Sequence, residues 1–131
     1  MSRVLIDTNA YTALMTGDSR VAVELTRSEA VLISPVVLGE LYDGFKGGTR
    51  QRENHAILSK FRDKPRTVSI AITENTAEWF AEIKQILRKK GLPIPINDVW
   101  IAASCMEHGA RLVSYDAHFS RIDGLLCWNE I

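Results

Sequence analysis

Short apolar runs alternate with longer amphipathic stretches along this chain, a pattern that predicts strands separated by helices. The expected strands cover residues 3–7, 31–34, 67–71, 111–114 and 125–128. The expected helices cover residues 8–15, 20–27, 35–46, 50–62, 73–90 and 97–109. Strands that alternate with helices predict an α/β fold with a mainly parallel central sheet flanked by helices on both faces.

Several helix ends carry a local signal. Ser34 and Pro35 predict a helix start, because the hydroxyl accepts a backbone N–H and proline lacks only an N–H that the first turn leaves unused. The long helix from Thr73 is expected to end in a basic turn followed by Gly91. After an extended loop that contains two prolines, Asn97 is expected to cap the next helix.

Apolar spacing also predicts parts of the core. The long helix carries a stripe made of Thr76, Trp79, Phe80, Ile83 and Leu87. This is the spacing of one buried face, so Trp79 and Phe80 are interpreted as core residues rather than as a base-stacking platform. Cys105 and Cys127 have apolar neighbours and are interpreted as small core residues rather than as a disulfide.

The chain has the size of one domain, and we expect a single domain over residues 1–131. No apolar stretch approaches the roughly 20 residues of a membrane span, so no membrane association is expected. The first residues lack the charged and apolar regions of a signal peptide, and a cytoplasmic location is therefore expected.

Formal net charge is zero, which argues against a nucleic-acid binder that relies on bulk positive charge. The charge is unevenly distributed, because residues 46–66 hold seven basic and two acidic side chains. This basic segment is interpreted either as a surface that holds a phosphate backbone or as a solvated helical hairpin.

Four acidic residues lie far apart in the sequence, yet each stands where a strand ends or a helix begins. They are Asp7, Glu40, Asp98 and Asp116, called the acidic quartet below. In a right-handed α/β fold these positions share one edge of the sheet, so the four side chains are expected to converge. Any one of them alone is more simply a helix cap or an exposed helical residue. Four converging carboxylates repel one another, however, and only a cation justifies such a cluster.

Oxygen ligands favour Mg²⁺ or Mn²⁺ over zinc. One or two such ions activate water and stabilise a phosphodiester during in-line displacement, so metal-dependent phosphodiester hydrolysis is the predicted chemistry. The polar neighbours of the quartet are Thr8, Asn9, Asn97 and Ser114. They are expected to orient the acids or hold water, although Thr8 and Asn97 fit equally well as helix caps. His118 has no partner recognisable from the sequence and is interpreted as a surface or sheet-edge imidazole.

Four segments of the chain resemble the PIN-domain ribonucleases, and within them the VapC-type toxins of prokaryotic toxin–antitoxin pairs. The segments are Val-Leu-Ile-Asp-Thr-Asn at 4–9, Ser-Pro-Val-Val-Leu-Gly-Glu-Leu at 34–41, Ile-Asn-Asp-Val-Trp-Ile-Ala-Ala at 96–103 and Leu-Val-Ser-Tyr-Asp-Ala-His-Phe at 112–119. Each is a weak signal, but the four in order span essentially the whole chain and are a strong one. The family often has Thr at the position of Ser114, which keeps the hydroxyl.

The resemblance implies a PIN-like α/β/α sandwich. It also implies that the acidic quartet binds Mg²⁺ or Mn²⁺ for endonucleolytic cleavage of RNA, leaving 5′-phosphate and 3′-hydroxyl ends. Structured RNA such as transfer RNA or ribosomal RNA loops is the implied substrate.

Homodimers, and a small cognate antitoxin that occupies the active-site groove, are the implied partners. The helices between residues 36 and 61 are a reasonable place for such contacts. Their candidate anchors are Tyr42, Phe45, Ile57 and Leu58, which fit equally well as intramolecular core.

Three other functions fit parts of the sequence. A haloacid-dehalogenase-like phosphatase also keeps an Asp after its first strand, but it wants a second Asp where this chain has Asn9, and no suitable Lys is assignable. A PIN nuclease that acts on DNA or in RNA maturation is a closer alternative. The non-enzymatic alternative is an RNA- or protein-binding module in which the acids only cap helices.

Overall fold

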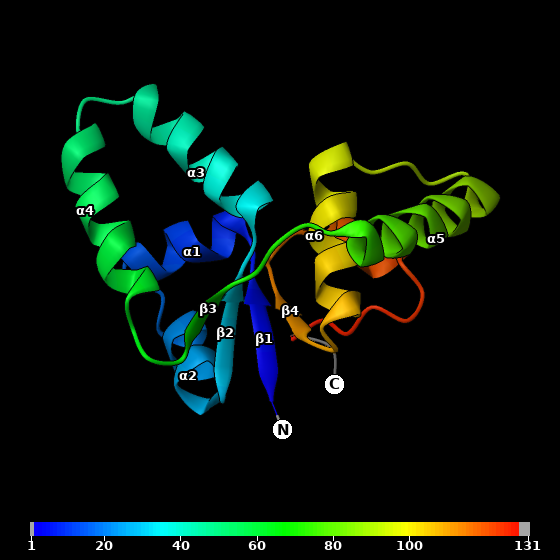
Figure 1. Ribbon diagram of the computed structural model, residues 1–131, viewed down its shortest axis with the longest axis horizontal. Helices are drawn as coiled ribbons and strands as arrows, with labels where there is room; N and C mark the ends of the chain where they lie inside the picture. Colours follow the sequence, from blue (N-terminus) through cyan, green and yellow to red (C-terminus); the bar gives the residue numbers. More distant parts are fainter. Residues whose placement is uncertain (1, 129–131) are drawn as a thin grey trace.

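The computed structural model describes residues 2–128 and contains a parallel sheet surrounded by helices (Figure 1). In chain order the elements are β1 (Arg3–Ile6), α1 (Thr8–Met15), α2 (Ser19–Arg27), β2 (Ala30–Ile33), α3 (Pro35–Lys46), α4 (Gln51–Arg62), β3 (Thr67–Ser69), α5 (Glu74–Lys90), α6 (Ile96–Glu107), β4 (Arg111–Val113) and a short 3₁₀ helix, η1 (Ala117–Arg121). The expected α/β class and the parallel sheet are confirmed.

The strand order determines where the helices lie. The four strands are arranged β3-β2-β1-β4 and all pairs are parallel. Two successive connections lead outward from β1 to β3, and the third returns across the sheet to β4. Right-handed crossovers therefore place α1 to α4 on one face and α5 and α6 on the other, as Figure 1 shows. The strand order reverses between β1 and β4, which is where α/β folds form their crevice.

The central strands are buried on both faces. Val4, Leu5 and Ile6 of β1 have no exposed surface. On one face α6 packs between the sheet and α5, and its small residues Ala102 and Ala103 are fully buried. Burial from both sides explains why these strands are continuous apolar runs rather than alternating patterns.

Two expected strands differ most from the prediction. β3 ends at Ser69 because its partner β2 ends at Ile33, where Ser34 already caps α3. The terminal strand expected at residues 125–128 is reduced to one parallel bridge between Leu112 and Cys127. β4 has only three residues, so it offers little backbone for a neighbour to pair with.

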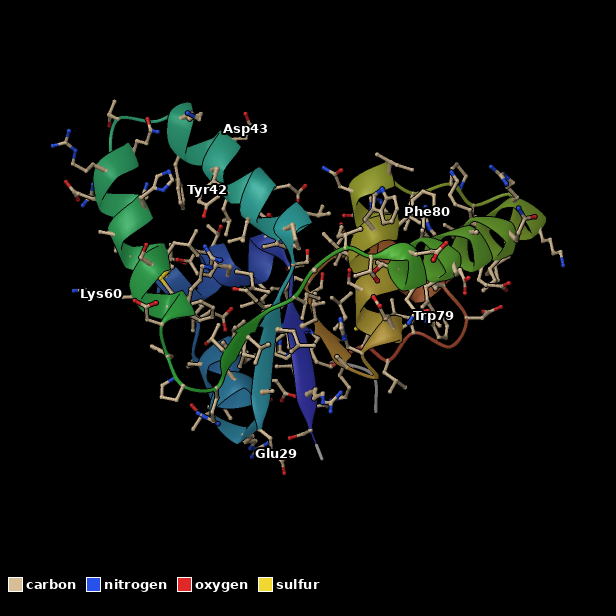
Figure 2. The ribbon with its side chains drawn as sticks, in the orientation of Figure 1. Glu29, Tyr42, Asp43, Lys60, Trp79 and Phe80 are labelled. Atoms are coloured by element: carbon tan, nitrogen blue, oxygen red, sulfur yellow. The ribbon has the colours of Figure 1, made fainter. Side chains whose placement is uncertain are left out.

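Two expectations about the helices are wrong. Asn97 does not cap α6, because Pro95 occupies the N-cap position and its carbonyl accepts the N–H of Asp98 at 3.0 Å. Trp79 is 37% exposed rather than in the core, because α5 packs against α6 rather than the sheet and buries only a narrow stripe. Figure 2 shows Phe80 near α6, where its ring stacks on Trp100 with 4.1 Å between centroids.

Other core predictions hold. Cys105 is fully buried, and Cys127 is partly buried against the core. Gly91 ends α5 in the left-handed conformation that glycine favours. None of the helices within residues 2–128 combines the length and the apolar character needed to cross a membrane.

Adjacent residues of α4 provide a test of the packing. Leu58 is 1% exposed in the core and Ile57 is 44% exposed. Leu58→Ala is expected to lower the free energy of unfolding by about 2–5 kcal/mol, because it removes buried methyl groups and leaves a cavity. Ile57→Ala is expected to cost less than about 1 kcal/mol, since alanine is the better helix former. Urea denaturation measures both, and equal losses would contradict this placement of α4.

Candidate active site

The acidic quartet stands at the edge of the sheet where the strands end. Asp7 follows β1 and caps α1, while Asp116 follows the neighbouring β4 and caps η1. Glu40 lies in the second turn of α3 and Asp98 in the first turn of α6. Four separate segments thus supply one acid each to the same edge, as the topology predicts.

Asp7 is the most buried member, with 5% of its surface exposed. Its Oδ1 accepts the N–H of Ala10 at 2.8 Å and its Oδ2 accepts the hydroxyl of Ser114 at 2.5 Å. Burial raises the pKa of Asp7 to about 6, these two hydrogen bonds oppose the rise, and repulsion from Asp98 and Asp116 adds to it. The fold therefore holds a carboxylate in a place where its charge is poorly stabilised.

The pKa of Asp98 is also raised. Burial is the largest cause that raises its pKa, followed by repulsion from Asp116 and from Glu40. One ligand atom from each of Asp98, Asp116 and His118 lies within 4.8 Å of the other two. The structure therefore groups Asp98 and Asp116 with His118, places Asp7 within electrostatic reach of both acids, and places Glu40 within reach of Asp98.

Glu40 is held by two other helices. Thr8 of α1 donates its hydroxyl to Oε1 at 2.5 Å, and Asn97 of α6 donates its amide to Oε2 at 3.4 Å. Glu40 is therefore not the freely exposed helical residue of the simpler interpretation. The carboxylate of Glu40 on α3 therefore links α1 and α6, which lie on opposite faces of the sheet.

Three of the four expected polar neighbours contact the quartet. Thr8 and Asn97 hold Glu40, while the hydroxyl of Ser114 donates to Asp7 and accepts the N–H of Asp116 at 2.9 Å. Asn9 is exposed, and within residues 2–128 its side chain hydrogen-bonds none of the acids. A helix turns about 100° per residue, so the position after Thr8 points away from Glu40.

His118 is the residue that the sequence interpretation placed least well. Its Nδ1 lies 3.1 Å from Oδ1 of Asp116 and 3.7 Å from Oδ2 of Asp98. The side chain is at the sheet edge and partly exposed, as expected, but it has two acidic partners. The sequence did hold one signal that places His118 near Asp116. An Asp at the start of a turn often accepts the backbone N–H two residues later, and His118 donates that N–H to Asp116 at 2.9 Å.

The donor set suits a hard divalent cation. Carboxylate oxygens from several elements converge, and burial, followed by their mutual repulsion, raises the pKa of Asp7 and of Asp98. Oxygen ligands of this kind favour Mg²⁺ or Mn²⁺. A cation at this edge would relieve the repulsion that the fold creates.

Comparison with known proteins identifies the class. Residues 4–125 match the PIN domain family, so the chain belongs to the PIN-domain family, and its curated relatives are VapC proteins. Ribonuclease VapC4 of Mycobacterium tuberculosis is 32% identical over 88 residues, which cover 67% of this chain and 68% of that protein. Ribonuclease VapC2 of Rickettsia felis is 29% identical over 106 residues, which cover 80% and 78%. The resemblance seen in the sequence is thereby confirmed.

The fold is found in solved structures as well. A chain in the crystal structure of VapBC2 from Rickettsia felis, bound to a DNA fragment from the promoter, superposes with a TM-score of 0.84 at 26% identity. The match covers 95% of this chain and 96% of that chain. The similarity over nearly the full length supports the PIN-like α/β/α sandwich.

The raised pKa of Asp7 predicts an unusual pH dependence. Because the folded-state pKa, about 6, exceeds the ordinary value of 3.8, the folded protein binds this proton more tightly than the unfolded chain. Stability from this group is therefore present at low pH and lost as pH rises through about 6. In EDTA at pH 7.5, Asp7→Asn is expected to raise the free energy of unfolding by about 1–3 kcal/mol, with the gain vanishing toward pH 4.

Asp18 provides the matched control for this urea-denaturation series. It caps α2 as Asp7 caps α1, with an acceptor bond from Val21 N at 3.0 Å. Its pKa is lowered, first by the hydrogen bond from Tyr115 and then by the one from Val21. Asp18→Asn is therefore expected to bring no gain at pH 7.5. Equal effects of the two substitutions would show that Asp7 is only a cap.

Proposed function

We propose that this protein is a metal-dependent endoribonuclease that acts as the toxin of a type II toxin–antitoxin pair. The observation that carries the proposal is the convergence of Asp98 and Asp116, with Asp7 and Glu40 in electrostatic reach, at the sheet edge of a PIN-domain chain. Curated relatives named as ribonucleases support RNA as the substrate class.

In this proposal the acidic quartet holds Mg²⁺ or Mn²⁺. Such an ion supplies Lewis-acid charge that activates water and stabilises the negative charge developing on the scissile phosphate. Thr8 and Asn97 keep both oxygens of Glu40 oriented. Ser114 keeps Asp7 and the backbone of Asp116 at a fixed separation. A role for Asn9 in holding water stays a prediction.

RNA is held, in this proposal, by the part of the basic segment that remains available. Arg62 bonds the hydroxyls of Tyr42 and Ser69, and Arg66 bonds the carbonyl oxygens of Thr26 and Ser28, so both have structural roles. Lys46, Arg52 and Lys60 are exposed and, among residues 2–128, have no side-chain hydrogen bond or ion pair. Figure 2 shows Lys60 pointing outward from α4. These cations are suited to phosphate contacts.

The proposed partners are a cognate antitoxin and a second copy of the chain. The similar VapBC2 structure supports an antitoxin partner. Leu58 is a core residue, whereas Tyr42 and Phe45 pack against His55 at centroid distances of 4.8 and 5.4 Å between α3 and α4. Ile57, at 44% exposed, is the candidate anchor that stays accessible. A toxin that cleaves cellular RNA would act in the cytoplasm.

The decisive experiment is cleavage of a mixed transfer and ribosomal RNA pool by purified, antitoxin-free protein. We expect discrete cuts in Mg²⁺ or Mn²⁺ that EDTA abolishes, with 5′-phosphate and 3′-hydroxyl ends. Asp98→Asn is expected to lower the cleavage rate by about a hundredfold or more, because it removes a charged ligand of the ion that stabilises the transition state. The matched control, Asp18→Asn, should leave cleavage unchanged.

The same assay separates the alternatives. Preferential cleavage of DNA would replace the RNA toxin with a DNA-directed PIN nuclease. Folded protein that takes up no divalent ion and cuts neither nucleic acid would favour a binding module in which the acids only cap helices.

A further inference from the structure

One ring nitrogen of His118 is buried without a hydrogen-bond partner. Among residues 2–128 its Nδ1 has none, although the side chain as a whole is 41% exposed. A buried polar atom without a partner costs free energy, so it needs an explanation. The nearest acidic atoms are Oδ1 of Asp116 and Oδ2 of Asp98, at 3.1 and 3.7 Å.

The backbone around His118 is fixed by a hydrogen bond and by buried neighbours. Its backbone N–H donates to Oδ1 of Asp116 at 2.9 Å, which starts η1. The next residue, Phe119, is 1% exposed and anchors η1 in the core, and Ile122 at 3% exposed anchors its end. The ring is therefore held beside the two carboxylates by packing on either side of it.

We propose that Nδ1 of His118 is a direct ligand of the divalent ion held by Asp98 and Asp116, so that this site mixes nitrogen and oxygen donors. The inference rests on the proposed metal-dependent function and adds a residue to it. A neutral imidazole coordinates metal through the lone pair of its unprotonated nitrogen. Ligation would therefore satisfy a nitrogen that lies beside two carboxylates without forming a hydrogen bond to either.

The spacing of the three side chains agrees with shared ligation. Adjacent ligands of a six-coordinate ion, each at about 2.1 Å, are about 3 Å apart. The Nδ1 to Asp116 distance of 3.1 Å matches this value, and the Nδ1 to Asp98 distance of 3.7 Å is somewhat longer than it. All three donor atoms also lie within 4.8 Å of one another.

The competing interpretation makes the opposite prediction. If His118 were a protonated ion-pair partner of Asp98 and Asp116, it would compete with the metal for their charge, and its removal would strengthen metal binding. If His118 is a ligand, its removal weakens binding, and Mn²⁺ suffers more than Mg²⁺ because imidazole is a softer donor than carboxylate. The sign of the change separates the two interpretations.

The test uses Mn²⁺ bound to the full-length, antitoxin-free protein. Pulsed electron paramagnetic resonance of the wild type is expected to show the ¹⁴N coupling of a coordinated imidazole. His118→Ala should abolish this coupling and lower Mn²⁺ affinity by about tenfold or more, with a smaller loss for Mg²⁺. The matched control is His108→Ala, because Nε2 of His108 is also buried without a partner but lies 3.9 Å from a single carboxylate, Glu107.

The possible outcomes are distinguishable. Coupling present in wild type and in His108→Ala, but lost in His118→Ala, supports ligation. The inference is overturned if the wild type binds Mn²⁺ without ¹⁴N coupling, or if His118→Ala binds Mn²⁺ as tightly as the wild type or more tightly. If Asp98→Asn abolishes that binding, the proposed metal site still stands. Absence of Mn²⁺ binding by folded wild type overturns both. The wild-type spectrum decides the question even if His118→Ala fails to fold.

Discussion

Asp7 is a carboxylate that the fold buries beside two others, and the candidate site depends on keeping it there. Burial and the repulsion from Asp98 and Asp116 raise its pKa to about 6. Two hydrogen bonds, from the N–H of Ala10 and the hydroxyl of Ser114, oppose that rise. Such a residue persists only where the surrounding structure stabilises its position, and here Val4, Leu5 and Ile6 of β1, directly before it, are fully buried. A buried carboxylate whose negative charge is poorly stabilised would be stabilised by a cation at this edge.

The site is also where the two helical layers meet. Glu40 of α3 is bonded by Thr8 of α1 from the same face and by Asn97 of α6 from the other. Any shift of α6 relative to α3 would alter the position of Glu40 and Asp98 together. The packing of α6 between α5 and the sheet therefore bears directly on the position of these two acids.

Much of the site was predictable, for a topological reason. Asp7 and Asp116 follow strands, Asp98 lies in the first turn of a helix and Glu40 in the second turn of another, and in a parallel α/β fold such positions share an edge. Helix capping and the burial of single side chains were predicted less reliably. Asn97 has the composition of a cap, but the carbonyl of Pro95 takes that position, and Asn97 is free to bond Glu40 instead. Trp79 has the spacing of a core residue, but α5 lies outside α6 and buries only a narrow stripe.

The alternation of strands and helices, and the sheet edge at which the acids gather, could be predicted from the chain alone. Both follow from hydrophobic periodicity and from the handedness of the connections between neighbouring elements. The bond from Ser114 to Asp7 across 107 residues, and the position of His118 beside Asp98 and Asp116, became visible only in the folded molecule. Those relations depend on register between β1 and β4 and on the anchoring of η1 by Phe119, and such long-range packing leaves no local signal in the sequence.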